Sequence, residues 1–457
     1  MGDVYAGGVF NITAVDCQNS DGDLFPAQRD TLLPVLPTRG GSIHTGRRVG
    51  LPKQEFESEI IFSELLSRAW VYQEVLLAPA NLFCTTEQMW WSCSGGTFSQ
   101  TFPESIQQFH TASSVEKSFS SLRREMSSLN SMVTPVSVVV GWMNILESYT
   151  NTSATRPDDR LVAIAGLASA YQSCFPEVLR EATYHSVIWS HEIWRQLLWE
   201  GRARPDASFP SSRFPTTHPM PSWSCASYNG PIKYQRTEDR SMLPVKLINL
   251  ESSGLDKFGR ATSLDQCTLH LRGALVPMTF IPPATSSSST HGHTLQAVLF
   301  PTGYKDARVD VAWDNSEELE SAARVASTKK DYVRAVLLQC HPRHGTILGL
   351  LLRPSSSSKS TGGLRKWVRC GLVKKFVNPG EFEYYQLAFR VSRYGETFRR
   401  ETPDYGLKSP SMSFADSLFR SNVTTPVRHK PPGDDAGRKD IWKKRLSSVI
   451  MDDIYMV

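Results

Sequence analysis

The segment Glu64–Cys93, ELLSRAWVYQEVLLAPANLFCTTEQMWWSC, constrains the fold more than any other part of the chain. Its first half predicts a helix, which should end near Ala78 because Pro79 cannot continue it and disfavours a helical residue before it. Two short apolar runs, 81–84 and 88–93, then predict a pair of strands. The predicted helix presents one stripe of residues at three- and four-residue steps: Phe62, Leu65, Leu66, Ala69, Trp70, Gln73, Leu76 and Leu77.

Two polar residues lie in or beside this apolar stripe. Gln73 shares it with Trp70, and Glu74 lies at its margin. A buried amide or carboxylate is costly unless it is hydrogen-bonded. In a structural role, Gln73 would tie the helix to a neighbouring loop, Glu74 would pair with Arg68 or another arginine, and Trp70 would anchor the core. In a functional role, Glu74 would be a reactive carboxylate beside an aromatic wall. The structural role is favoured, because ion-pair networks perturb carboxylates as readily as active sites do.

The same segment resembles the closing motif of the fungal heterokaryon-incompatibility (HET) domain. Members of that family carry Arg-Gly-Trp-x-x-Gln-Glu-x-Leu-Leu-(Ser/Ala)-Pro, followed by a Trp-x-Cys strand. Ala69 replaces the usual glycine, a change that a helix tolerates. The residues that match are Arg68, Trp70, Gln73, Glu74, Leu76, Leu77, Ala78, Pro79, Trp91 and Cys93.

Three further segments resemble parts of the same family, and residues 349–389 do so more loosely. The N-terminal segment is similar to a run that lies in the middle of the HET domain. The other two are similar to an Asp-(Arg/Lys)-Leu-x-Ala helix with its preceding Trp and Tyr, and to an Ala-Pro-Ser-Trp-Ser-Trp-Ala-Ser-x-x-Gly-Pro turn. The segments are Tyr5–Phe25, Trp142–Ala168 and Met220–Pro231.

Two earlier motifs of the HET domain, a Leu-Ser-Tyr-x-Trp-Gly strand and a Leu-Trp-Ile-Asp-x-Leu-Cys-Ile-x-Gln strand and loop, do not occur in this sequence. The chain also opens at once on residues that look internal: Val4, Val9, Phe10, Ile12 and Val15. We therefore expect a truncated or mis-started HET protein whose α/β domain, distantly similar to TIR domains, lacks its first strands.

The 457 residues suffice for two or three domains with sizeable cores. The resemblance to the HET family and the pattern of polar and apolar residues together predict the C-terminal part of a HET domain at 1–98 and a mainly helical region at 99–245. Short alternating runs predict a β-rich domain at 246–400, with strands near 268–276, 295–300, 333–340, 346–352 and 384–391. Residues 401–457 are polar and predict a flexible tail, with one short helix at most near the basic segment 438–445.

Within the helical region, Ser94–Ser128 predicts a polar surface excursion, and 133–149 and 160–171 predict two helices. Trp189, Trp194 and Trp199 predict a third helix that also carries His185 and His191. Around Trp223, Ser222 and Ser224 invite a nucleophile interpretation, but no Gly-x-Ser-x-Gly elbow surrounds them. A turn that docks Trp223 into a core is favoured.

The amino-acid composition bears on the classes of partner and on the cellular location to be expected. Eight cysteines without a C-x-x-C pair favour an intracellular, cytoplasmic protein rather than a disulfide framework or a zinc site. The turn at Cys340, His341 and His344 is expected to be a strand end, not a metal site. A net charge of +5 with scattered basic residues argues against nucleic-acid binding, and no run is long enough to span a bilayer.

The resemblance implies a protein of fungal non-self recognition and regulated cell death that binds protein partners. An enzyme is the less favoured interpretation, and no cofactor is expected. In the alternative, a TIR-like enzyme would cleave NAD with Glu74 as the catalytic carboxylate, although the sequence holds no phosphate-binding glycine loop. A third interpretation is an inactive remnant, or a regulatory partner of intact HET proteins.

Overall fold

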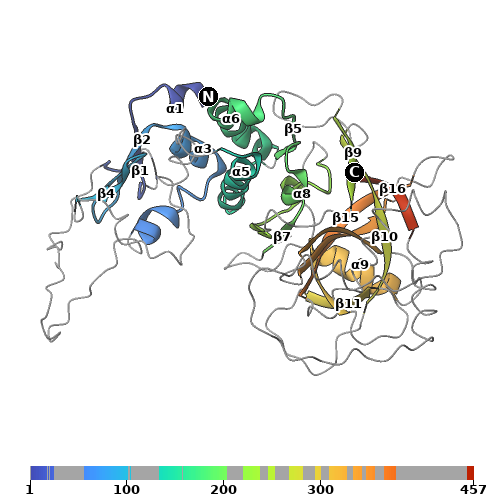
Figure 1. Cartoon of the computed structure of the whole chain (residues 1–457). Helices are drawn as coiled ribbons and strands as arrows, with labels where there is room; N and C mark the ends of the chain where they lie inside the picture. Colours follow the sequence, from blue (N-terminus) through green and yellow to red (C-terminus); the bar gives the residue numbers. More distant parts are fainter. Residues whose placement is uncertain are drawn as a thin grey trace, which may run out of the picture.

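The computed structural model describes residues 2–17, 19, 21–24, 56–100, 103, 133–156, 158–202, 220–236, 245–252, 267–280, 294–299, 308–326, 333–341, 346–355, 365–376 and 450–456. These residues form a mixed α/β structure with several sheets (Figure 1). A four-stranded sheet and the first helices lie at one end in this view, and an eight-stranded sheet lies at the other. The predicted α/β class is therefore confirmed at this coarse level.

The four-stranded sheet contains the strand pair predicted after Pro79. Its order is β1 (Asn11–Ala14), β2 (Ala80–Cys84), β3 (Met89–Cys93) and β4 (Gly96–Ser99). Strand β1 runs parallel to β2, and the other neighbours are antiparallel. Strand β4 begins inside the predicted surface excursion; apart from residues up to 100 and Pro103, that excursion lies outside the described residues. Helices α1 (Gly2–Ala6), η1 (Glu57–Ile61, a π-helix) and α3 (Ala69–Leu77) accompany this sheet.

Helix α3 ends where the sequence predicts but begins later. Its last residue is Leu77, and Ala78 is extended before Pro79. The predicted stripe from Phe62 to Leu66 is not part of it, and Phe62 is 72% exposed. The backbone around Arg68 forms a bridge with Ser153 instead, in which Ala69 N donates to Ser153 O and Ser153 N donates to Ser67 O. Backbone groups used in this bridge cannot also continue a helix toward the N-terminus.

The apolar residues at the start of the chain are mostly not internal, contrary to expectation. Val15 is buried, whereas Val4, Val9, Phe10 and Ile12 are exposed. Successive side chains of a strand point to opposite faces, and β1 directs Thr13 and Val15 inward. Ile12 and Phe10 therefore fall on the outward side.

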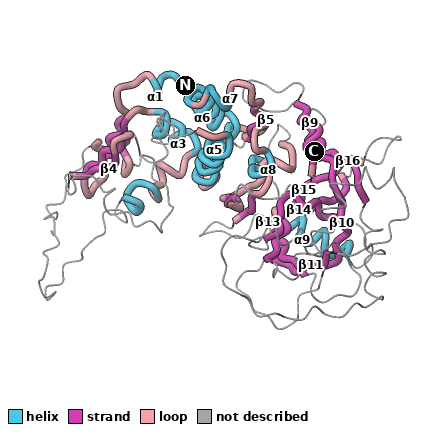
Figure 2. The backbone as a smooth tube through the Cα atoms, viewed as in Figure 1, coloured by secondary structure: helices cyan, strands magenta, loops and turns pink. Residues whose placement is uncertain are grey.

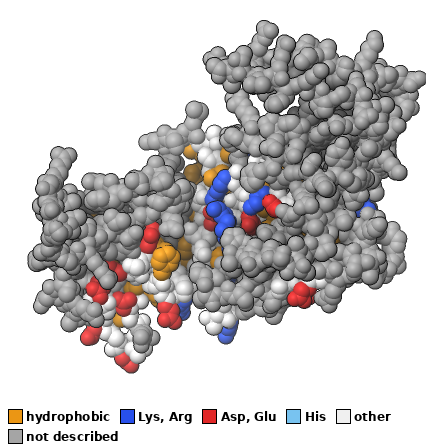
Figure 3. Space-filling view, turned by 90° about the horizontal axis from the view of Figure 1, so that it is seen from below, with side chains coloured by type: hydrophobic (Ala, Val, Ile, Leu, Met, Phe, Trp, Pro, Cys, Tyr) orange, Lys and Arg blue, Asp and Glu red, His pale blue; other side chains and the backbone are white. Residues whose placement is uncertain are grey.

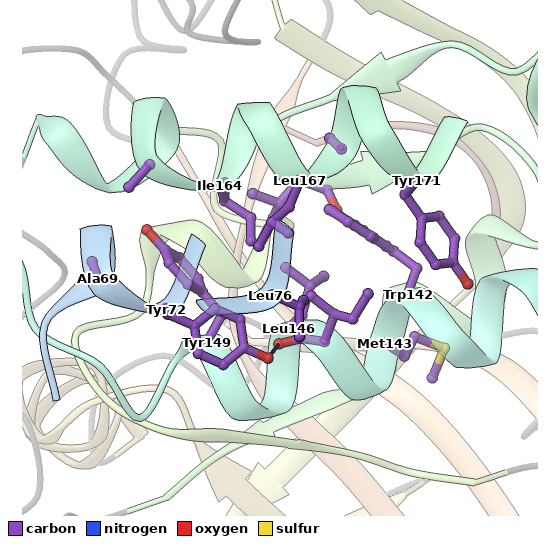
Figure 4. Close-up of a cluster of buried hydrophobic side chains, with 14 of the residues drawn as sticks. Ala69, Tyr72, Leu76, Trp142, Met143, Leu146, Tyr149, Ile164, Leu167 and Tyr171 are labelled. Atoms are coloured by element: carbon purple, nitrogen blue, oxygen red, sulfur yellow. Dashed lines mark hydrogen bonds between the residues drawn. The ribbon is translucent and has the colours of Figure 1, made fainter. Parts of the chain in front are cut away.

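Helices α5 (Pro135–Tyr149) and α6 (Asp159–Cys174) confirm the two predicted helices. Thr134 caps α5 through a reciprocal pair of hydrogen bonds with Ser137. The two helices pack against α3 around one buried core, to which α3 contributes Tyr72 and Leu76 (Figure 4). The short helix α7 (Pro176–Leu179) follows α6.

The third helix predicted from the tryptophan spacing is wrong. Trp189 lies in β6 (Ile188–Trp189), which pairs with β5 (Tyr184–His185), and Trp194 lies in the four-residue helix α8 (Ile193–Gln196). Trp199 begins β7 (Trp199–Gly201), which pairs with β8 (Ile232–Tyr234). Ser186 and Val187 reverse the chain with positive φ angles of 44° and 71°. Trp189 and Trp199 enter one buried core, whereas Trp194 packs against another, so the five-residue spacing does not mark one face of a helix.

The eight-stranded sheet holds most of the remaining described residues, and few helices accompany its strands (Figure 2). Strand β11 pairs with both β10 and β12, so the ring β10–β11–β12–β15–β14–β13 closes on itself. Strand β9 adds to β10 outside this ring, β16 pairs with both β10 and β15, and α9 contacts β10 and β12. The elements are β9 (Lys246–Ser252), β10 (Cys267–Phe280), β11 (Thr294–Leu299), β12 (Arg308–Trp313), α9 (Ser316–Ala326), β13 (Arg334–His341), β14 (Thr346–Pro354), β15 (Lys366–Phe376) and β16 (Ile450–Met456).

Four of the five predicted strands of the β-rich part are present as β10, β11, β13 and β14. Cys340 and His341 end β13, as predicted for that turn. The predicted strand at 384–391 and the basic segment 438–445 lie outside the described residues. Residues 450–456 form β16 rather than part of a polar tail, because Ile454 and Met456 are fully buried.

Candidate functional site at helix α3

Helix α3 holds Gln73 and Glu74 on different sides. Gln73 faces helix α6 and is only 3% exposed, whereas Glu74 is half-buried. The two residues were predicted at and beside the apolar stripe, and the structure agrees with that placement. They nevertheless meet different partners.

Gln73 lies directly against Gly166 of α6. A Cβ atom added to Gly166 would lie 3.0 Å from Gln73 Cδ and would overlap Nε2. Gln73 therefore occupies the space that a side chain at 166 would need. It locks two helices together, whereas the sequence predicted a tie to a loop. Within the described part of the chain, Gln73 Oε1 is buried and has no hydrogen-bond partner.

Glu74 interacts with Tyr5 of helix α1. Burial raises the pKa of Tyr5 to about 12, and the hydrogen bond to Glu74 and the negative charge of that carboxylate add to the effect. Tyr5 thus stays protonated at neutral pH and donates to the Glu74 carboxylate. This contact differs from the arginine pairing that the sequence predicted for a structural Glu74.

The other motif residues surround this pair without converging on it. Arg68 is exposed, and its backbone rather than its side chain joins the bridge to Ser153. Trp70 and Leu77 are partly buried against the core, and Pro79 is exposed. On β3, Trp91 and Cys93 lie on the half-exposed face, where the Trp91 ring is 5.6 Å from the ring of Phe10.

Glu59 has a structural role that was not predicted from the sequence. Its carboxylate accepts from Trp90 Nε1 at 2.8 Å and from Thr85 Oγ1 at 2.9 Å, and Gln88 Nε2 lies 3.5 Å away. These contacts fasten η1 to the β2–β3 hairpin. The adjacent tryptophans carried a weak signal, because one of two consecutive strand residues must point inward and a buried indole N–H needs an acceptor.

The two candidate serines are structural, as favoured from the sequence. Trp223 is fully buried, and Ser224 is the N-cap of the short 3-10 helix η3 (Cys225–Ser227). The Ser224 hydroxyl donates to Ser186 O and accepts from Ala226 N. Ser222 Oγ accepts from the backbone N–H of Arg369. Both hydroxyls are therefore used in packing contacts.

The two histidines predicted on one helix, His185 and His191, lie in a strand and in a turn instead. His185 lies in β5 and is 5% exposed, and burial lowers its pKa from 6.5 to about 4. Both of its ring nitrogens are buried without a hydrogen-bond partner among the described residues. His185 is consequently a neutral core side chain at pH 7.

Among the described residues, no three His, Cys, Asp or Glu side chains are grouped so that they could hold a metal ion. None of the described helices combines the length and apolar character needed to cross a membrane. On the face drawn in Figure 3, described acidic side chains gather toward one end and basic ones lie nearer the middle.

Comparisons of this chain with protein-family models, with curated proteins and with solved structures found no match. The candidate site therefore has to be interpreted from its own geometry.

Proposed function

We propose that this chain is a HET-domain protein of fungal non-self recognition and regulated cell death, in which α3 and α6 form the part that binds protein partners or transmits their signal. The proposal rests on the resemblance of four separate segments. One observation supports it best: Gln73 and Gly166 come from two of those segments and interlock. Such a contact requires a glycine at one position and a side chain of suitable length at the other.

The other resembling segments join the same core. Tyr72 donates to the Ile145 carbonyl, and Arg160 Nη1 donates to the Tyr228 carbonyl at 2.8 Å. The core cluster contains Val15 of the N-terminal segment and residues of α3, of the α5–α6 pair and of the turn after Trp223. Four segments that are distant in sequence thus share one packed unit, as a common functional domain requires.

Induced expression of the chain in a fungal cell tests this function. We expect growth arrest or death with the wild-type chain, and normal growth with Gly166→Val at an equal protein level. Gly95→Ala is the matched control, since its added Cβ would meet only Cys93 Sγ at 3.5 Å. Normal growth with the wild-type chain would refute an autonomous killer and favour the inactive or regulatory interpretation.

A second candidate is NAD cleavage by Glu74, and the Tyr5 contact is the observation that favours it. The half-buried Glu74 carboxylate accepts a hydrogen bond from the Tyr5 phenol, which holds it in place. In a glycosidic cleavage such a carboxylate would stabilise the positive charge that develops on the ribose. NAD would then be the substrate.

The rate of NAD loss with purified protein decides this candidate. Glu74→Gln should abolish cleavage, whereas Tyr5→Phe should retain part of it because the carboxylate remains. Glu64→Gln, at an exposed position on the same segment, is the control. Equal rates for wild type and Glu74→Gln would exclude a catalytic Glu74.

A further inference from the structure

Strand β16 fills a slot between strands β10 and β15. These two strands do not pair with each other, and neither is close to β16 in the sequence. It pairs antiparallel with β10 from Leu269 to Leu275 and parallel with β15 at Lys366 and Trp367. In the chain, β16 is separated from β15 by residues 377–449, which lie outside the described residues. The slot is thus made by β10 and β15, and its occupant is a short segment from far along the chain.

Near the C-terminal end of β16, two inward side chains are apolar and closely matched to their neighbours. Ile454 lies opposite Leu271, and Met456 lies between Leu269 of β10 and Trp367 of β15. All five side chains are at most 1% exposed. They belong to the core cluster that also contains Leu197, Leu198 and Trp223, which precede the eight-stranded sheet in the chain.

The outward face of β16 is polar and meets basic side chains. Asp453 Oδ1 is 3.2 Å from His270 Nε2, and in the register Asp453 lies opposite Arg272. The ring of Tyr455 stacks on His270 with centroids 4.2 Å apart and planes at 21°. Asp453 keeps 49% of its side chain exposed. The rim of the slot therefore suits an acidic residue followed, two positions later, by an aromatic one.

We propose that the β10–β15 slot is a peptide-acceptor site, and that β16 is its resident occupant, which an extended segment of a partner protein displaces. The fitting peptide has two apolar residues, at the positions of Ile454 and Met456, with an acid and an aromatic residue on the alternate face. Strand addition supplies affinity through the backbone, and the alternate side chains supply specificity. This proposal is independent of the function proposed for α3.

The resident strand has a large advantage over a free peptide of the same sequence. Its docking is intramolecular, so a peptide at micromolar concentration displaces it poorly. Replacing Ile454 and Met456 of the chain by alanine should weaken resident docking at least about tenfold for each residue. The weakened chain should then accept the intact peptide.

The experiment uses the full chain and a fluorescent peptide, SVIMDDIYMV, which is the sequence of residues 448–457. We expect fluorescence anisotropy to give a dissociation constant about 100-fold lower for the Ile454→Ala, Met456→Ala chain than for wild type. The same peptide with both alanines should not bind. The chain variant Ile248→Ala, at a 42% exposed position on β9, should behave as wild type.

No gain in peptide binding by the double variant, with its near-ultraviolet circular dichroism retained, would overturn the proposal. If that variant does not fold, hydrogen exchange on the wild-type chain gives the decision. A displaceable β16 requires the amides of Ile454 and Met456 to exchange at least about tenfold faster than those of Val276 in β10 and Leu350 in β14. Equal protection would mean that β16 opens only with the whole barrel, and the proposal would be wrong.

Discussion

The guanidinium of Arg369, in strand β15 of the eight-stranded sheet, lies 3.4 Å from the ring centroid of Trp199, in strand β7. The same guanidinium donates to the carbonyls of Leu197 and Trp199 and pairs with Asp314 at 3.2 Å. Arg369 and Asp314 are 0% and 2% exposed. One buried arginine therefore joins the eight-stranded sheet to the segment that contains Leu197 and Trp199.

Arg369→Met should destabilise the protein by about 3 to 5 kcal/mol, because it leaves the Asp314 carboxylate buried without its cation. Adding Asp314→Leu should recover much of this loss. Arg236→Met, which removes a partly exposed ion pair with Glu147, should cost under about 1 kcal/mol. Urea unfolding measures all three. If Arg369→Met alone were as stable as wild type, the contact between β15 and β7 would not depend on the Arg369–Asp314 pair.

Gly166→Ala should have opposite effects in two backgrounds. In the wild-type chain the added methyl group collides with Gln73 and should destabilise by about 1 to 3 kcal/mol. In a Gln73→Ala chain the collision is absent, and alanine should stabilise helix α6 by about 1 kcal/mol through its higher helix propensity. Thermal unfolding of the four proteins gives the coupling. The same change in both backgrounds would contradict the interlock.

Glu59→Leu should destabilise the four-stranded sheet by about 1 to 3 kcal/mol, because the buried Trp90 indole N–H loses its acceptor, whereas the Thr85 hydroxyl still donates to the Gln88 carbonyl. Glu59→Gln should cost less, since its amide oxygen still accepts one bond. The measurement is unfolding followed by tryptophan fluorescence. Glu64→Gln is the exposed control, and an equal loss for Glu59→Gln and Glu59→Leu would exclude hydrogen bonding as the cause.

His185 should make the protein sensitive to mild acid. Its pKa is lowered from 6.5 to about 4 by burial, so between these values the unfolded chain binds a proton that the folded chain does not. Stability due to this group is complete above pH 6.5 and falls as the pH drops toward 4, by about 1 to 3 kcal/mol in total. His185→Leu should flatten this part of the curve of unfolding free energy against pH. His191→Asn, in the adjacent turn, should not.

Local sequence rules determined the elements whose causes are local. Pro79 ended α3, Thr134 began α5, and alternating apolar runs marked β10, β11, β13 and β14. The order of helix and strand pair after Ala69 followed from these rules, as did the burial of Gln73 beside a half-buried Glu74.

Only the tertiary structure decided which residues meet across long distances in the chain. Tyr5 with Glu74, Gln73 with Gly166 and Glu59 with Trp90 are pairs that no periodicity links. The same holds for β16, whose buried Ile454 and Met456 pair with strands far away in the chain. Periodicity reports which face of an element is apolar, but a long-range contact depends on how several elements pack at once. That packing set the roles of Arg369 and Trp199, which the sequence alone presented as an ordinary charge and one of three spaced tryptophans.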